Sequence, residues 1–215
     1  MACATLTGVS LVLPAGAAVL AACCGWPASR LVRSYTQRTI APPILAVSTA
    51  ILAFAAAAYV HPVLAGCAAA WVGVCAVPLA VIDALVYRLP DLLTMAALGG
   101  TAGFLLAAAG VAGDWTDLAW SAAGAAALAS LFLILAIARP GSAGLGDAKL
   151  SLSLGALAAW PGWDVLATAL IAAFALAAGY AVWLLAARRA TLRSRLPFGP
   201  FLLAGTLIAV LVASL

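Results

Sequence analysis

The stretch "CAVPLAVIDALVYRLP", residues 75–90, belongs to an apolar run of membrane-span length that nevertheless contains an aspartate. Around it, the 215-residue chain is 67% hydrophobic and only 7% charged, with a mean hydropathy of +1.23. An ordinary soluble domain has about 25% charged residues. The composition therefore predicts an all-α integral membrane protein that is surrounded by membrane lipids.

Eight apolar runs follow one another along the chain, each bounded by charged residues, Pro or Gly. They cover residues 4–24, 40–60, 63–87, 92–112, 118–138, 148–163, 165–187 and 197–215. A helix needs about 20 apolar residues to cross the hydrocarbon, so we expect a polytopic protein with about eight transmembrane helices. The sixth run is short, since the 14 residues between Lys149 and Asp164 span only about 21 Å as a helix.

The first run ends in "LAAC", residues 20–23, which resembles a lipoprotein cleavage site. No Lys or Arg precedes this run, although a secretory signal carries positive charge there, and the segment after it is basic. We therefore expect residues 4–24 to remain as the first span, followed by a short basic loop over residues 25–39.

If that loop is cytoplasmic, the basic residues all lie on one side of the membrane and half of the acidic residues lie on the other. All 10 Lys and Arg residues then lie inside: Arg30, Arg33, Arg38, Arg88, Arg139, Lys149, Arg188, Arg189, Arg193 and Arg195. The opposite side receives His61, Asp114, Asp117 and Asp164. Cytoplasmic loops are enriched in Lys and Arg, so we expect a multi-pass protein of the cell inner membrane with both termini outside. The net charge of +4 then reflects topology, and we expect no nucleic-acid partner.

The usual metal and nucleophile motifs are absent from the sequence. The five cysteines form no CxxC pair, which favours small apolar packing residues over a zinc site or a disulfide framework. The chain has one histidine, His61, and contains no GxSxG or HExxH motif. We expect no metal and no cofactor.

Asp83 is the most unusual of the six acidic residues, all of which are aspartates. The apolar run continues for four residues beyond it, so Asp83 lies about one helical turn inside the end of its span. An ionisable group at that depth is costly unless it faces a partner or a cavity. Asp83 is therefore a candidate functional residue, and the alternative is a side chain that extends to the membrane surface.

Two more aspartates, Asp91 and Asp147, lie at the start of apolar runs on the predicted cytoplasmic side. Asp91 directly follows Pro90, and an Asp at this position can cap the first turn of a helix, so we assign it a structural capping role. Asp147 follows the sequence "GLG" and could also be a simple cap. Gly144 and Gly146, however, lack side chains and let a substrate backbone approach closely.

The predicted topology places Asp83 and Asp147 on the same membrane face, because one ends the third span and the other begins the sixth. Two carboxylates close together in a poorly solvated site cannot both ionise easily, so the pair shares a proton. The charged carboxylate can then take a proton from water while the protonated one donates to a scissile carbonyl. This arrangement predicts aspartic hydrolysis, provided that the two helices are neighbours.

Three motifs in order resemble those of the prepilin peptidases. "VIDALVYRLPDLLT" has an Asp eight positions before the last residue of the Leu-Pro-Asp turn, "GLGDAKL" is similar to their GxGD motif, and "LPFGPFLLAG" is similar to their third signature. The resemblance covers residues 62–215 and implies a six-helix GxGD aspartic peptidase core, preceded over residues 1–61 by two further helices.

The resemblance also implies the roles of individual residues. Asp83 and Asp147 would be the catalytic pair, and the segments around them would shape the site through Gly144, Gly146, Lys149, Pro197, Gly199 and Pro200. Such enzymes remove the leader of type IV prepilin or pseudopilin precursors at the cytoplasmic membrane face. Bifunctional members carry a methyltransferase insert with CxxC pairs after the first span, and here residues 25–39 leave no room for it.

Three alternatives to a prepilin-type peptidase remain open from the sequence. A polytopic transporter could carry protons on intramembrane aspartates, although here the acids gather at the membrane faces and leave the midplane apolar. A catalytically inactive homologue would keep the fold without the activity. A GxGD protease that cuts inside transmembrane segments is the third, and the Pro-Phe-Gly-Pro motif favours the prepilin type.

Overall fold

The computed structural model describes residues 15–37, 41–59, 63–138, 144–191, 194 and 196–213. Outside these ranges lie residues 4–14 of the first predicted span, Arg38, His61, Arg139, Arg193 and Arg195. Within the described ranges all regular structure is helical and no strand occurs. The predicted class, an all-α polytopic membrane protein, is confirmed.

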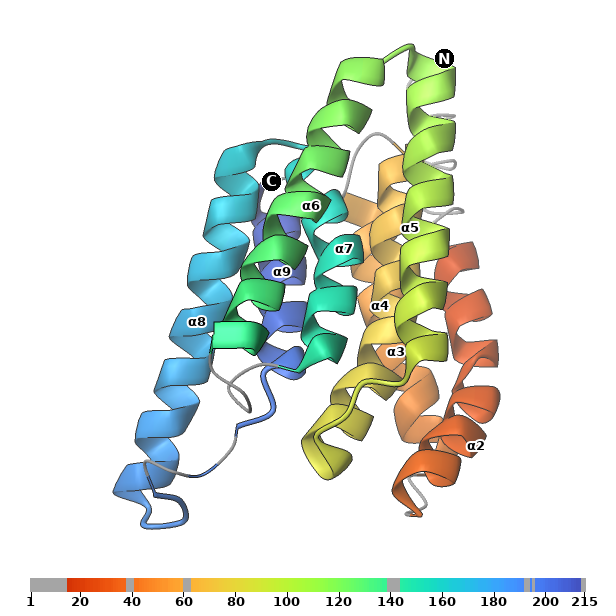
Figure 1. The fold of residues 1–215 in the computed structure, drawn as a ribbon. Helices are drawn as coiled ribbons and strands as arrows, with labels where there is room; N and C mark the ends of the chain where they lie inside the picture. Colours follow the sequence, from red (N-terminus) through yellow and green to blue (C-terminus); the bar gives the residue numbers. More distant parts are fainter. Residues whose placement is uncertain are drawn as a thin grey trace.

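The helices form an elongated bundle (Figure 1). In chain order they are Ala15–Cys23, α2 (Gly25–Thr36), α3 (Pro42–Tyr59), α4 (Val63–Val86), α5 (Asp91–Ala112), α6 (Trp115–Ala138), α7 (Leu145–Ala159), α8 (Trp163–Ala186) and α9 (Gly199–Ala213). Each predicted apolar run corresponds to one of these helices, and α2 is additional.

Four of the described helices are long and apolar enough to cross a membrane, namely α4, α5, α6 and α8. A fifth span results if Ala15–Cys23 and Pro27–Thr36, which meet at a bend of 45°, are counted together. The apolar stretch of α3, Pro42–Ala55, and the helices α7 and α9 are shorter. By length and composition the described chain thus has four to five full-length spans, fewer than the expected eight.

Residues 25–36 form a helix, which corrects the predicted loop. Gly25, Ser29 and Val32 follow the spacing of one helical face and are buried, with Val32 fully so. Arg33, the next residue along the chain, is exposed. Val32 packs in a cluster with Leu45 of α3 and with Ile82 of α4, so α2 supports α4 beside Asp83.

The short helix α7 is the most enclosed helix of the described bundle. Nearly all of its residues from Asp147 to Ala159 are buried, and it contacts α4, α5, α6, α8 and α9. A helix surrounded by protein does not have to match the thickness of the bilayer, because its polar ends are covered by neighbouring helices. This position explains how the short sixth run is accommodated.

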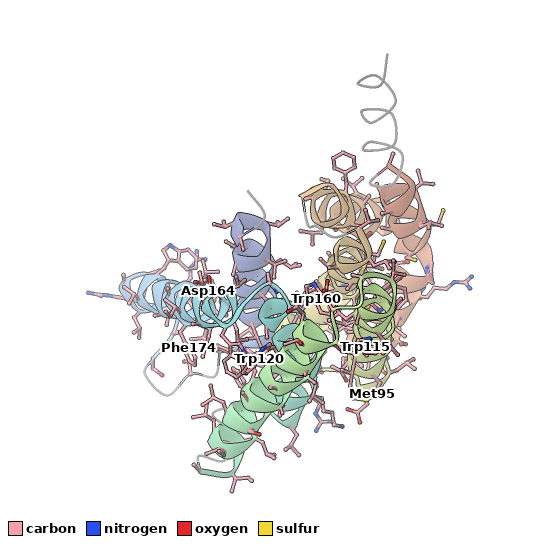
Figure 2. All side chains as sticks on the ribbon, turned by 90° about the horizontal axis from the view of Figure 1, so that it is seen from above. Met95, Trp115, Trp120, Trp160, Asp164 and Phe174 are labelled. Carbon is pink, nitrogen blue, oxygen red and sulfur yellow. The ribbon has the colours of Figure 1, made fainter. Side chains whose placement is uncertain are left out.

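The two ends of the bundle differ in character. The last turns of α4 and α8 and the first turns of α7 and α9 lie toward the lower end in Figure 1, and α8 ends well below the first turns of α7 and α9. Figure 2 looks down on the opposite end, where Trp115, Trp120, Trp160 and Asp164 are labelled. Trp120 and Trp163 pack edge to face there, with ring centroids 6.1 Å apart.

Candidate active site

Asp83 lies in the last turn of α4, where it is only 5% exposed. Its Oδ2 atom accepts a hydrogen bond of 3.0 Å from the backbone amide of Gly199, 116 residues further along the chain. Its own carbonyl oxygen accepts from the amide of Tyr87 at 2.8 Å. Tyr87 has a φ of 55°, so it closes the helix with the left-handed conformation that usually requires Gly. Asp83 is thus held through its side chain and its backbone.

Asp147 lies in the first turn of α7 and is 7% exposed. Its Oδ2 atom accepts a hydrogen bond of 3.1 Å from the amide of Gly144, the residue that precedes the helix. The Asp147 amide in turn donates to the Gly144 carbonyl at 3.0 Å. The carboxylate therefore does cap its helix, as the simpler interpretation expected, and this contact also fixes its orientation.

The structure brings the two carboxylates together, as the predicted topology requires. α4 and α7 are in direct contact, and the charges of Asp83 and Asp147 are near enough to act on each other. One oxygen of each carboxylate is bound by a backbone amide, from Gly199 for Asp83 and from Gly144 for Asp147. The arrangement is a pair of poorly solvated carboxylates held by main-chain donors.

Leu89 lies between the glycine that precedes Asp147, Gly146, and the glycine that binds Asp83, Gly199. A Cβ atom built on Gly146 would lie 2.8 Å from Leu89 Cβ, and one on Gly199 would lie 3.5 Å from Leu89 Cδ2. The absence of a side chain at Gly146 therefore lets α7 approach the connection between α4 and α5. Gly144 differs, because a Cβ atom there would make only ordinary contacts, at 3.7 Å or more. Its observed contribution is the amide that binds Asp147.

The segment before α9 is positioned by its phenylalanine. Phe198 packs against Phe132 of α6 and Phe174 of α8, with ring centroids 5.4 Å and 5.1 Å away. Pro200 is the second residue of α9, where no amide proton is needed. Pro197 lies in the connection that precedes α9. Within the predicted site-shaping segment, the amide of Gly199 is therefore the group that contacts the pair, through its hydrogen bond to Asp83.

Lys149 and Asp91 bind each other beside the pair. Lys149 Nζ donates to Asp91 Oδ1 at 2.7 Å, and the two side chains are 40% and 70% exposed. Asp91 is the first residue of α5, Pro90 is the N-cap, and no side-chain capping hydrogen bond is present there. The capping role predicted for Asp91 is corrected accordingly: its carboxylate joins α5 to α7.

Sequence reasoning missed two residues that build the site, Tyr87 and Leu89. Both lie within the quoted motif, but their roles depend on a left-handed backbone and on contacts with glycines far along the chain. The position of Leu89 directly before Pro90 was the only sign in the sequence that pointed to it.

Comparison with known proteins agrees with this geometry. No curated protein and no solved structure matches the chain significantly. The model of the type IV leader peptidase family matches residues 67–182, more than half of the chain, and this range contains both buried aspartates. A leader peptidase is a hydrolase, and the long apolar helices make this one a multi-pass membrane protein. The chain belongs to the type IV leader peptidase family.

Proposed function

We propose that this protein is an aspartic endopeptidase that removes the leader of type IV prepilin-like or pseudopilin precursors at the cytoplasmic face of the cell inner membrane. The observation that carries the proposal is the pair of buried carboxylates, Asp83 and Asp147, each held by a backbone amide at one end of the bundle. The family supplies the substrate class.

The chemistry requires that the pair hold one proton between the two carboxylates, because both are buried and their charges repel. The ionised carboxylate takes a proton from water as the water oxygen attacks the scissile carbonyl, while the protonated carboxylate donates to the carbonyl oxygen. The tetrahedral intermediate then returns a hydroxyl proton to one carboxylate. The other carboxylate protonates the leaving nitrogen, the C–N bond breaks, and the pair ends with the proton it began with.

The distribution of charge supports the cytoplasmic placement. Lys149, Arg188 and Arg189 lie at the end of the bundle that holds the two carboxylates, whereas Asp117 and Asp164 begin helices at the opposite end. Lys and Arg are enriched in cytoplasmic loops.

We also expect peptidase activity without methyl transfer. Helix α2 follows the first span directly, and the segment Gly25–Thr39 contains no CxxC pair. The new N-terminal amine of the product is then left unmethylated by this chain.

Co-expression with a candidate prepilin precursor tests the proposal, with leader removal followed by gel mobility and product mass. We expect cleavage by the unsubstituted protein and its loss in both Asp83→Asn and Asp147→Asn at normal membrane levels. Asp117→Asn is the matched control, because it makes the same change in the first turn of α6 at the opposite end. Complete cleavage by either site variant would overturn the mechanism.

A further inference from the structure

A cavity of about 650 Å³ lies between the end of α4, the last turns of α8 and the connection from α8 to α9. This volume is within the range of about 300–1,000 Å³ that is typical of ligand sites. Its walls include Tyr87, Tyr180, Leu184, Arg189, Thr191 and Ser194. Neither Asp83 nor Asp147 lines the cavity, so it is a site of its own, separate from the carboxylate pair.

The aromatic residues of α8 place this cavity at the membrane surface. Trp163 and Trp183 are 20 positions apart in α8, which corresponds to about 30 Å along a helix and matches the thickness of the hydrocarbon. Tryptophans gather at the two boundaries between hydrocarbon and headgroups. Figure 1 shows α8 ending well below the first turns of α7 and α9. The residues that follow Trp183, Arg189 among them, therefore lie at the depth of the lipid headgroups.

Arg189 is the charged group of this cavity, and aromatic rings position it. Its guanidinium carbon lies 5.8 Å from the ring centroid of Trp183, which stacks on Tyr180 with a centroid distance of 5.8 Å. Tyr180 in turn packs against Phe201 of α9 at 5.4 Å. A guanidinium over an aromatic ring keeps its N–H donors available. Within the described residues Arg189 forms no ion pair, so its donors can bind a ligand.

The turn that carries Arg189 is held by main-chain hydrogen bonds. Arg188 has a φ of 53°, and the amides of Arg188 and Arg189 donate to the carbonyls of Leu185 and Leu184 at 3.0 Å and 2.9 Å. This is the hydrogen-bond pattern of a Schellman motif, which closes a helix. The backbone of Arg189 is therefore fixed as well as its side chain.

The walls match the two halves of an anionic phospholipid. One wall carries Arg189 and the hydroxyl groups of Thr191 and Ser194, and the other carries the apolar Ala181 and Leu184 of α8. A guanidinium forms charge-assisted hydrogen bonds with phosphate, and no acidic side chain is among the described residues that line the cavity. In the sequence, residues 187–198 contain four arginines and no acidic residue. Basic clusters directly after a membrane span attract anionic lipids.

We propose that this cavity binds the phosphate group of an anionic phospholipid, with Arg189 as the residue that contacts the phosphate. The apolar part of the lipid then follows Ala181 and Leu184 toward the hydrocarbon. Because Tyr87 belongs to the cavity wall, the bound lipid bridges the ends of α8 and α4. Neither the site nor its occupant depends on the proposed peptidase activity.

Native mass spectrometry of the full chain in detergent tests the proposal, with phosphatidylglycerol, phosphatidylcholine and inorganic phosphate as probes. We expect one phosphatidylglycerol to be retained at a concentration about tenfold lower than phosphatidylcholine requires. Arg189→Gln removes this difference. Ala181→Phe fills the cavity without changing its charge and weakens the retention of phosphatidylglycerol by a similar factor. Arg33→Gln is the matched control, because it removes an equal charge from the last turn of α2, outside the cavity, and leaves retention unchanged.

Equal retention of phosphatidylglycerol by Arg189→Gln and the unsubstituted protein would overturn the proposal. An equal loss in Arg33→Gln would indicate a general attraction of anions, and unchanged retention in Ala181→Phe would place the lipid outside the cavity; either result contradicts the site. Inorganic phosphate that displaced the lipid at the lipid's own concentration would identify a site for a free anion instead. The melting temperature of each variant in phosphatidylcholine, expected to equal that of the unsubstituted protein, separates lost binding from unfolding.

Discussion

Gly199 contacts the Asp83 carboxylate in two ways. Its amide donates to Oδ2 at 3.0 Å, and a Cβ atom built on it would lie 2.8 Å from the same oxygen and 3.3 Å from Cγ. No flexible side chain separates the two residues. A substitution here therefore tests the position of the carboxylate without removing any charge.

Gly199→Ala is expected to lower kcat for leader removal about a hundredfold, because a shift of about 1 Å at a reacting group can cost that much. Gly103→Ala in α5 is the control, since a Cβ atom there meets nothing within 4 Å. Purified variants compared for kcat and for thermal unfolding check this prediction. Equal rates for the two variants would show that the glycine does not position Asp83.

The ion pair of Lys149 and Asp91 is expected to matter little for stability. Both side chains are substantially exposed, and exposed pairs contribute about 0–1 kcal/mol. Asp91→Asn should therefore retain most of the cleavage activity and change the unfolding free energy by less than about 1 kcal/mol. The rate of leader cleavage and the unfolding curve in detergent measure these two quantities. A loss of activity as large as that of Asp83→Asn would place Asp91 in the catalytic machinery.

Asp83 and Asp147 were predictable from the sequence because an ionisable residue in an apolar run is conspicuous. Leu89 was not singled out, because its role depends on how closely Gly146 and Gly199 approach it. Such contacts join residues more than 50 positions apart. The two candidate carboxylates were therefore conspicuous in the sequence, whereas the packing around them was not.

At the scale of helices, the packing of α6 against α7 positions Asp147. Gly155 faces Gly124, and a Cβ atom built on Gly155 would lie 2.6 Å from the Gly124 carbonyl oxygen. Nearby, the buried Ser121 hydroxyl donates to the Ala156 carbonyl at 2.7 Å. Small residues and interhelical hydrogen bonds of this kind hold membrane helices together.

Gly155→Ala is expected to destabilise the protein by about 1–3 kcal/mol, because the added methyl group must displace the backbone of α6. Gly179→Ala makes the same change in α8, where a Cβ atom meets nothing within 4 Å, and should not destabilise. Thermal unfolding in one detergent compares the two. Equal melting temperatures would contradict the close contact between α6 and α7.

Most of the helices were predictable, since eight apolar runs bounded by charged residues, Pro or Gly each correspond to one of them. Helix α2 was missed because its basic residues suggested a loop. Its buried face consists of Gly25, Ser29 and Val32, and two of these residues are not strongly apolar. The apolar residues of α2 nevertheless repeat with the period of a helix, so this periodicity was an available signal for the helix.

The two ends of the bundle are expected to lie on opposite sides of the membrane. The connection between α8 and α9 is next to the site, and the turn at Gly113 between α5 and α6 is at the other end. An epitope inserted after Ala190 should be cut by protease only in inverted vesicles, and one inserted after Gly113 only in spheroplasts. The reverse pattern would place the carboxylates outside the cell.

The rate of leader removal by purified Asp83→Asn, Asp147→Asn and the double variant measures whether the two carboxylates act as one catalytic unit. Groups that act as a unit are not additive. We therefore predict that each single variant loses at least about a thousandfold in kcat and that the double variant loses little more than either. A single variant within about tenfold of the unsubstituted protein would contradict the two-carboxylate mechanism.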